Sequence, residues 1–234
     1  MKVVVIDDDP TGSQAVHSCL LLLRWDVQAL RRGLRHGSPL LFVLADTRSL
    51  TPEAAAQRNR EIVTNLEVAL TEEGLDRSEI QLVSRGDSTL RGHGVVEPAV
   101  LERCFGPFAA TLHVPAFLEG GRTTVNGVHL LHGEPVHTTP FAKDRLFGFS
   151  TSDLSHWLEQ KSAGAICAAD VVKVSLDDLD QASVGGMTPL IQRLAALQGN
   201  ATVVVDAEHQ SQLAALAAAV LALKGERRFL FRSA

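Results

Sequence analysis

The sequence predicts an α/β protein with a mostly parallel sheet and helices on both faces, a three-layer sandwich of the Rossmann-like kind. Two observations support this fold class. Short runs of aliphatic and β-branched residues recur without the alternation of a half-exposed strand, which is typical of parallel strands buried on both faces. Between these runs lie segments with helix start and stop signals, so strands and helices alternate along the chain.

The first strand, residues 3–6, is followed at once by three carboxylates, Asp7, Asp8 and Asp9. In an open α/β sheet, ligands bind outside the carboxyl ends of the strands. Three adjacent acids repel one another and gain little from folding alone, so a cationic group or a substrate proton is the expected reason for them. The alternative is an acidic turn in which Asp9 or Thr11 caps the next element.

The other elements follow in order along the chain. Strands are predicted at residues 16–23, 40–45, 80–83, 111–114, 201–206 and 228–231. Helices are predicted at residues 26–36, 51–74, 152–161, 187–197 and 210–224. Asp26 and Thr51 are good helix caps at the N-terminus, and Gly74 is a typical residue after a helix C-terminus. Residues 163–174 should hold one or two strands, and residues 128–136 a β-hairpin.

Polar clusters follow three of the predicted strands. Asp8 and Asp9 follow the first strand, Arg48 follows residues 40–45, and a third cluster follows residues 80–83 and contains Arg85, Asp87, Ser88, Thr89 and Arg91. If these strands are parallel neighbours, the clusters converge on one edge of the sheet. An arginine fork matches a carboxylate, and hydroxyls can pair with substrate hydroxyls. The alternative reading of the third cluster is a surface turn with weak ion pairs.

A second loop, residues 115–127, is rich in glycine and hydroxyls. Its segment 120–124 is open to two interpretations, an anion-binding nest of backbone N–H groups or a glycine-rich approach to a hairpin. The loop lacks the spacing of a P-loop, and the sequence has no G-x-G-x-x-G motif.

Composition excludes several classes of protein. A net charge of −5 over 234 residues argues against nucleic-acid binding. The three cysteines are isolated, which predicts buried thiols rather than disulfides or a zinc site, and the nine histidines show no pairing expected of metal ligands. The absence of a signal sequence or of a long apolar run predicts a cytoplasmic protein with no membrane span. No metal-binding residues are predicted.

One short motif suggests a different enzyme. Asp7 to Thr11 fits D-x-D-x-T, the opening motif of haloacid-dehalogenase-like phosphohydrolases, in which the first aspartate is the nucleophile and Mg²⁺ lies beside it. That family also needs a downstream lysine and an acidic pair at a strand end. Lysines are scarce here, and Asp177 and Asp178 follow a predicted strand only loosely. This reading is kept as the alternative.

Three longer motifs, in order, resemble the four-carbon acid sugar kinase family, the D-threonate, D-erythronate and 3-oxo-tetronate kinases. Residues 8–12 match its D-D-x-T-G, and residues 87–92 match its D-S-T-x-R-G. Residues 115–129 are similar to its P-A-F-P-x-G-R-T-T-x-x-G-x-H, with Leu118 in place of the usual proline and one residue of looser spacing. The segments 47–49 and 141–144 also fit, and residues 229–234 resemble the family's junction between two domains.

The resemblance implies a substrate-binding half of a kinase. In that family the N-terminal domain binds the acid sugar and the C-terminal domain binds ATP, used with Mg²⁺. Residues 1–234 are expected to be the first domain alone, with the nucleotide-binding domain missing and supplied in cis or in trans. A kinase activity of this chain by itself is therefore uncertain.

The strand-end clusters and the resemblance together suggest roles for single residues. Asp8 or Asp9 would bind the polyol and act as the catalytic base, with Asp9 preferred because it lies nearer the turn. The substrate carboxylate would be held by Arg48, Arg85 and Arg91, and the substrate hydroxyls by Asp87, Ser88 and Thr89. Arg122 and Thr123 would complete the rim that faces the missing domain.

Three hypotheses stay open at this point. The chain is the substrate-binding half of an acid-sugar kinase, a Mg²⁺-dependent phosphohydrolase that uses Asp7, or a non-catalytic acid-sugar-binding module. The sequence does not choose among threonate, erythronate and 3-oxo-tetronate. It leaves the oligomeric state open as well, since a domain built to face another could expose an apolar patch and form a homo-oligomer.

Overall fold

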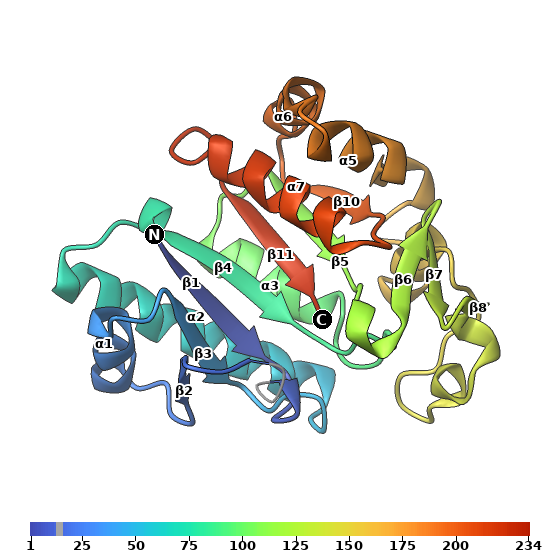
Figure 1. Cartoon of the computed structure of the whole chain (residues 1–234). Helices are drawn as coiled ribbons and strands as arrows, with labels where there is room; N and C mark the ends of the chain where they lie inside the picture. Colours follow the sequence, from blue (N-terminus) through green and yellow to red (C-terminus); the bar gives the residue numbers. More distant parts are fainter. Residues whose placement is uncertain (13–15) are drawn as a thin grey trace.

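A computed structural model describes residues 1–12 and 16–234. Its centre is an eight-stranded parallel sheet with the order β2-β3-β1-β4-β11-β5-β10-β9 (Figure 1). The strands are β1 (Lys2–Asp7), β2 (Leu20–Leu22), β3 (Leu40–Leu44), β4 (Ile80–Arg85), β5 (Ala110–Val114), β9 (Val172–Val174), β10 (Ala201–Val205) and β11 (Phe229–Ser233). The predicted fold class, an α/β protein with a mostly parallel sheet, is confirmed.

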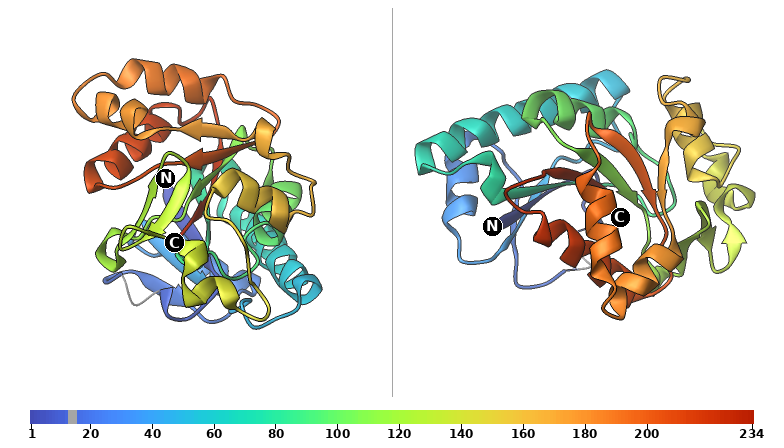
Figure 2. Two further views of the ribbon diagram at one scale, coloured as in Figure 1. Left: turned by 90° about the vertical axis from the view of Figure 1, so that its right-hand side faces the viewer. Right: turned by 90° about the horizontal axis from the view of Figure 1, so that it is seen from above.

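Helices cover both faces of this sheet. They are α1 (Val27–Arg35), α2 (Pro52–Glu73), α3 (Val96–Phe105), α4 (Leu154–Lys161), α5 (Leu176–Ser183), α6 (Met187–Ala195) and α7 (Gln210–Ala222). Helices α1, α2 and α3 share one apolar core with β1, β3 and β4, and α5, α6 and α7 share another with β5, β9 and β10. The two groups lie on opposite sides of the sheet, as the view from above shows (Figure 2).

The predicted helix caps form as expected. Asp26 accepts a hydrogen bond from the Ala29 N–H at the start of α1, and Thr51 accepts one from Ala54 at the start of α2. Gly74 ends α2 in the left-handed conformation, with φ of +66°. The buried runs become strands because an apolar segment without alternation can be buried only in the middle layer of such a sandwich.

The structure contains two helices, α3 and α5, that were not predicted, and a strand at residues 122–125 where a loop was expected. The prediction of one or two strands in residues 163–174 is confirmed by a single short strand, β9, preceded by turns and a 3₁₀ helix. Val171 is buried in a third apolar cluster around Trp157 and Ile166 packs partly against it, whereas most of residues 163–170 are exposed.

A small antiparallel sheet, β6 (Arg122–Val125), β7 (Val128–Leu131) and β8 (Glu134–Pro135), stands beside the main sheet. The predicted hairpin is confirmed, since Leu131 pairs with Glu134. The carboxylate of Asp206, at the end of β10, accepts the N–H groups of Asn126 and Gly127 at 2.9 and 2.8 Å. This contact holds the β6–β7 turn against the carboxyl end of the main sheet.

No helix of the described residues is long and apolar enough to cross a membrane.

Candidate functional site

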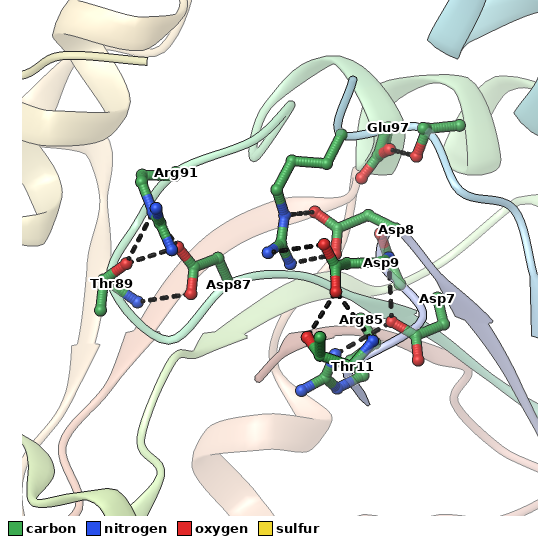
Figure 3. A network of polar contacts seen from close by, with 12 residues as sticks. Asp7, Asp8, Asp9, Thr11, Arg85, Asp87, Thr89, Arg91 and Glu97 are labelled. Atoms are coloured by element: carbon green, nitrogen blue, oxygen red, sulfur yellow. Dashed lines mark hydrogen bonds and ion pairs between the residues drawn. The ribbon is translucent and has the colours of Figure 1, made fainter. Parts of the chain in front are cut away.

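The three predicted polar clusters meet at the carboxyl ends of neighbouring strands. Strand β1 pairs with β3 on one side and with β4 on the other, both in parallel. The residues that follow these strands therefore lie side by side, as Figure 3 shows for the aspartates after β1 and for Asp87 to Arg91 after β4. The predicted convergence is confirmed.

Asp8 and Asp9 share one arginine. The Arg48 guanidinium donates to both carboxylate oxygens of Asp8, from Nη2 at 2.7 Å and from Nε at 3.2 Å, and its Nη1 lies 3.1 Å from Asp9 Oδ2. A backbone hydrogen bond also joins the loop after β3 to the loop after β1, from the Arg48 N–H to the Asp8 carbonyl at 3.1 Å. All three side-chain nitrogens of Arg48 are thus used by the two aspartates.

The two carboxylates differ in exposure and in acidity. Asp8 is buried, and burial raises its pKa to about 6 although Arg48 pulls the value down. The Asp9 side chain is 22% exposed. Burial would raise the pKa of Asp9, but hydrogen bonds from the Thr11 hydroxyl and N–H, with the charge of Arg48, lower it below the usual value. Asp9 is therefore an accessible, ionised carboxylate, and Asp8 an inner one.

Asp7 lies on the other side of the turn and is fully buried. Its Oδ1 is 3.0 Å from Arg85 Nη1, while its Oδ2 has no hydrogen-bond partner among the described residues. Burial raises the pKa of Asp7 more than the charge of Arg85 lowers it. Gly12 packs on this pair, since a Cβ at Gly12 would lie 1.8 Å from Arg85 Nη1.

The loop after β4 forms a second group, built on Asp87. Arg91 Nε donates to Asp87 Oδ2 at 2.6 Å, and the Thr89 hydroxyl and N–H donate to the same carboxylate (Figure 3). Burial would raise the pKa of Asp87, but these hydrogen bonds, with the charges of Arg48 and Arg91, lower it. The guanidinium of Arg91 also stacks over the Phe141 ring at 4.9 Å.

A buried polar network lies beneath the site, and sequence reasoning missed it. Arg232, near the end of β11, donates from Nη1 to Glu97 Oε2 and to Ser84 Oγ, both at 2.7 Å. The other Glu97 oxygen accepts the hydroxyl of Thr47, the residue before Arg48. Glu97 is on α3, 135 positions from Arg232, so nothing in the local sequence indicates the pair.

His129 connects the small sheet to the loop after β4. Its Nε2 is 2.7 Å from the Ser88 carbonyl, and its Nδ1 is 2.9 Å from the Thr124 hydroxyl. Burial lowers its pKa to about 4, so the ring is neutral at physiological pH. A carbonyl can only accept, so the proton is on Nε2 and Nδ1 accepts from Thr124. The side chain that holds Ser88 in place is therefore a fixed neutral histidine.

Arg122 and Thr123 are less closely connected to this network. Arg122 donates to the Gly120 carbonyl at 2.6 Å and lies over the Phe117 ring, and Thr123 pairs with Leu130 within the hairpin. The prediction of an anion-binding nest in this segment is wrong. Its N–H groups at positions 120, 121, 122 and 124 donate to backbone carbonyls, as expected for the alternative, a hairpin approach.

The environment of Asp7 does not fit a phosphohydrolase nucleophile. That role needs a carboxylate open to the substrate and to Mg²⁺, whereas Asp7 is enclosed and paired with Arg85. Within residues 1–12 and 16–234, no three His, Cys, Asp or Glu side chains are arranged to hold a metal ion. The aspartates of the short D-x-D-x-T match are instead paired with arginines, Asp7 with Arg85 and both Asp8 and Asp9 with Arg48.

Comparison with known proteins identifies the family of the chain. Residues 3–234 match a protein family that is described as "sugar-binding N-terminal domain". The chain is 27% identical to a D-erythronate kinase of Heliobacterium modesticaldum over 229 residues, which is 92% of this chain and 47% of that protein. It is 33% identical to a D-threonate kinase of Cupriavidus necator over 181 residues, 76% of this chain and 38% of that protein.

Solved structures share the fold. A domain of unknown function from Bordetella bronchiseptica, a domain-swapped dimer with bound citrate, superposes with a TM-score of 0.75 at 25% identity over all of this chain and 54% of that one. A Haemophilus influenzae protein superposes with a TM-score of 0.68 at 19% identity, over 98% of this chain and 53% of that one. The second likeness shows the fold alone.

The fold is that of an α/β domain with polar residues at the carboxyl ends of its parallel strands, and the family that it matches is one of sugar-binding domains. More specifically, the chain belongs to the family of sugar-binding N-terminal domains of four-carbon acid sugar kinases. It spans about half the length of the curated relatives that it matches.

Proposed function

We propose that this chain binds the substrate of an ATP-dependent kinase that phosphorylates a four-carbon acid sugar, threonate, erythronate or 3-oxo-tetronate, on its terminal hydroxyl. One observation carries the proposal: the strand ends hold both a partly exposed, ionised carboxylate, Asp9, and the hydroxyl- and arginine-rich group at Asp87, Thr89 and Arg91. A polyhydroxy acid needs both kinds of partner. The citrate bound to the Bordetella relative has similar chemistry, a hydroxyl beside carboxylates.

In this proposal the residues of the site have different roles. Asp9 is the carboxylate that a substrate hydroxyl can reach, so it is the base, while buried Asp8 holds Arg48 in place. Phosphoryl transfer depends on a carboxylate that orients the attacking hydroxyl and accepts its proton. Asp87, Ser88 and Thr89 bind hydroxyls, and Arg85 and Arg91 face the substrate carboxylate. Arg122 and Thr123 form the outer rim.

ATP with Mg²⁺ supplies the transferred phosphoryl group in such a kinase. The segment that the sequence suggested as an anion cradle does not fit a nucleotide phosphate, because its N–H groups at positions 120, 121, 122 and 124 already donate to carbonyls. The proposal therefore gives this chain the binding and orientation of the sugar acid only. It assigns the nucleotide site to a second domain, in cis or in trans, and a cytoplasmic location to the protein.

The proposal is tested by calorimetric titration of this chain with D-threonate and D-erythronate, with and without ATP and Mg²⁺. We expect heat from at least one tetronate. Asp9→Asn should weaken its binding about tenfold, since a hydrogen bond to a charged group contributes about 1.5–3 kcal/mol. Asp177→Asn is the matched control, because Asp177 is exposed and far along the chain on α5.

Two results would contradict the proposal. The first is the absence of tetronate binding by a chain that melts cooperatively. The second is release of phosphate from a sugar phosphate by this chain alone, lost in Asp7→Asn, which would support the phosphohydrolase. Turnover of a tetronate when the nucleotide-binding half of a relative is added would distinguish a kinase half from a non-catalytic binding module.

A further inference from the structure

A small cavity adjoins the candidate site where β4, β5 and β11 end. Asp87 and Arg91 line it from the loop after β4, and Arg232 lines it from β11. Leu90, Leu154 and Trp157 form its apolar wall. Its volume of about 30 Å³ is enough for roughly two water-sized groups, such as the two oxygens of a carboxylate. Asp87 and Arg91 belong both to the site and to the lining of the cavity.

Arg232 brings a fixed, half-used guanidinium to this cavity. Its Nη1 is anchored by Ser84 and Glu97, but no described residue accepts a hydrogen bond from its Nε or Nη2. These two nitrogens form the edge of the fork that binds carboxylates side-on. Gly86 packs directly on this guanidinium, since a Cβ there would lie 2.2 Å from Arg232 Nη2 and 2.5 Å from Arg232 Cζ.

Two other arginines, Arg48 and Arg91, differ in how many of their side-chain nitrogens have no acceptor. Arg48 uses all three of its nitrogens on Asp8 and Asp9. Arg91 uses only Nε, on Asp87 and Thr89, and in the described part of the chain its two Nη groups meet no acceptor. The unused donors that line the cavity therefore come from Arg91 and Arg232. Asp87 adds little repulsion there, because Arg91 and Thr89 already hold its charge.

Trp157 closes the cavity on the side of helix α4. Its side chain is buried, and its indole Nε1 has no hydrogen-bond partner among the described residues. The ring packs directly on the backbone of the loop after β4, since a Cβ at Gly94 would lie 2.5 Å from it. The ring is therefore packed between the loop on one side and the apolar cluster of α4 on the other.

We propose that this cavity receives the carboxylate end of the acid sugar, with Arg232 and Arg91 as its ligands, and that Trp157 limits the substrate to four carbons. The inference rests on the proposed function and deepens it. It adds Arg232 as a specificity-determining residue beside Arg91. It also removes Arg85 from the set of carboxylate ligands, because Arg85 is paired with Asp7 and does not line the cavity.

The role of Arg232 is tested by titrating variants with D-threonate, or with D-erythronate if that is the tetronate bound, and with the corresponding amide, which lacks the charge. Arg232→Lys keeps a positive charge beside Glu97 but loses the fork. We expect it to weaken binding of the acid about tenfold and to leave binding of the amide within about twofold. The double variant E97Q/R232Q, which leaves no buried charge unpaired, should do the same. Arg60→Lys, at an exposed position on α2, is the control.

The role of Trp157 is tested with five-carbon sugar acids. We expect the natural chain to bind the tetronate at least tenfold more tightly than a pentonate such as D-arabinonate. Trp157→Phe removes part of the wall and should reduce this preference to about threefold or less. Thermal melting confirms that each variant is folded.

The outcomes separate the two proposals. If the natural chain binds no tetronate, the proposed function fails and this inference fails with it. If the natural chain binds a tetronate and Arg232→Lys and E97Q/R232Q bind acid and amide as it does, Arg232 is not a carboxylate ligand. An unchanged preference for four carbons in Trp157→Phe overturns the assignment of that residue.

Discussion

Gly92 lies against the carboxylate of Asp8, so closely that a Cβ at Gly92 would be 2.7 Å from Asp8 Oδ2. Its φ of +92° is in the region that favours glycine. The loop after β4 therefore packs its backbone directly on the aspartate that holds Arg48. The two polar groups of the site, one after β1 and one after β4, meet at this contact.

Substitution of Gly92 by alanine should damage both stability and binding. The unfavourable φ and the forced movement of Asp8 together should cost about 3 kcal/mol of unfolding free energy. Gly74→Ala is a matched control, because Gly74 also has a positive φ but has no atom within 4 Å of an added Cβ. It should cost about 1 kcal/mol and leave tetronate binding intact. Urea unfolding and calorimetry measure both effects, and equal losses in the two variants would contradict the expectation.

The raised pKa of Asp8 should appear in the pH dependence of stability. With a pKa of about 6 in the folded protein and an ordinary value near 3.8 when unfolded, the folded state retains a proton that the unfolded state has lost. The natural chain should therefore lose stability relative to Asp8→Asn as the pH rises from about 4 to about 6, and the difference should be constant above that. Urea unfolding of both proteins at several pH values measures this difference. A flat difference across this range would be inconsistent with the burial of Asp8.

His129 should give the opposite dependence on pH. Its pKa falls from 6.5 to about 4 on folding, so the unfolded state binds a proton between these values that the folded state does not. Relative to His129→Gln, the natural chain should lose stability as the pH falls from about 6.5 to about 4. Nitrogen-15 NMR at pH 5.5 should show a neutral ring protonated on Nε2. A charged ring at that pH would contradict the lowering of the His129 pKa by burial.

The pair of Glu97 and Arg232 should be far more sensitive to single than to double replacement. Their side chains are only 3% and 8% exposed, so Glu97→Gln leaves Arg232 as a buried cation without its counter-charge. This variant should lose about 3 kcal/mol or more of stability, and E97Q/R232Q markedly less, because it removes both charges. A double-mutant cycle in urea gives the coupling energy. Additive losses would mean that the two side chains do not depend on each other.

Much of the fold could be predicted because its signals are local. The buried runs after Met1 and before Asp46 have the composition of parallel strands, and the caps at Asp26 and Thr51 mark helices that form as expected. Helix α3 has no such signal, since Val95 precedes it and makes no side-chain cap. Helix α5 did have one, the capping box of Ser175 and Asp178, which sequence reasoning took for a loose acidic pair.

The position of the site at one edge of the sheet could be predicted from the sequence, but only some of the contacts between its side chains could. Parallel strands that end in polar residues bring those residues to one edge, whatever the details of the loops. Which nitrogen of Arg48 meets which aspartate depends on loop conformation, and no pattern in the sequence indicates that Arg48 is fully occupied. Arg232 and Glu97 meet only through the packing of β11 on β4 and α3, a contact between distant parts of the chain.

Strand β11 lies between β4 and β5 and pairs with both. Residues 229–233 therefore join two half-sheets, β2-β3-β1-β4 and β5-β10-β9, that otherwise have no common edge. Before β11 inserts, each half exposes an unpaired strand that another chain can capture. The same insertion carries Arg232 to Glu97 and to the cavity. Strand β11 thus completes both the sheet and the proposed carboxylate pocket, and a ligand bound by Arg232 should stabilise the joined sheet against separation of its halves.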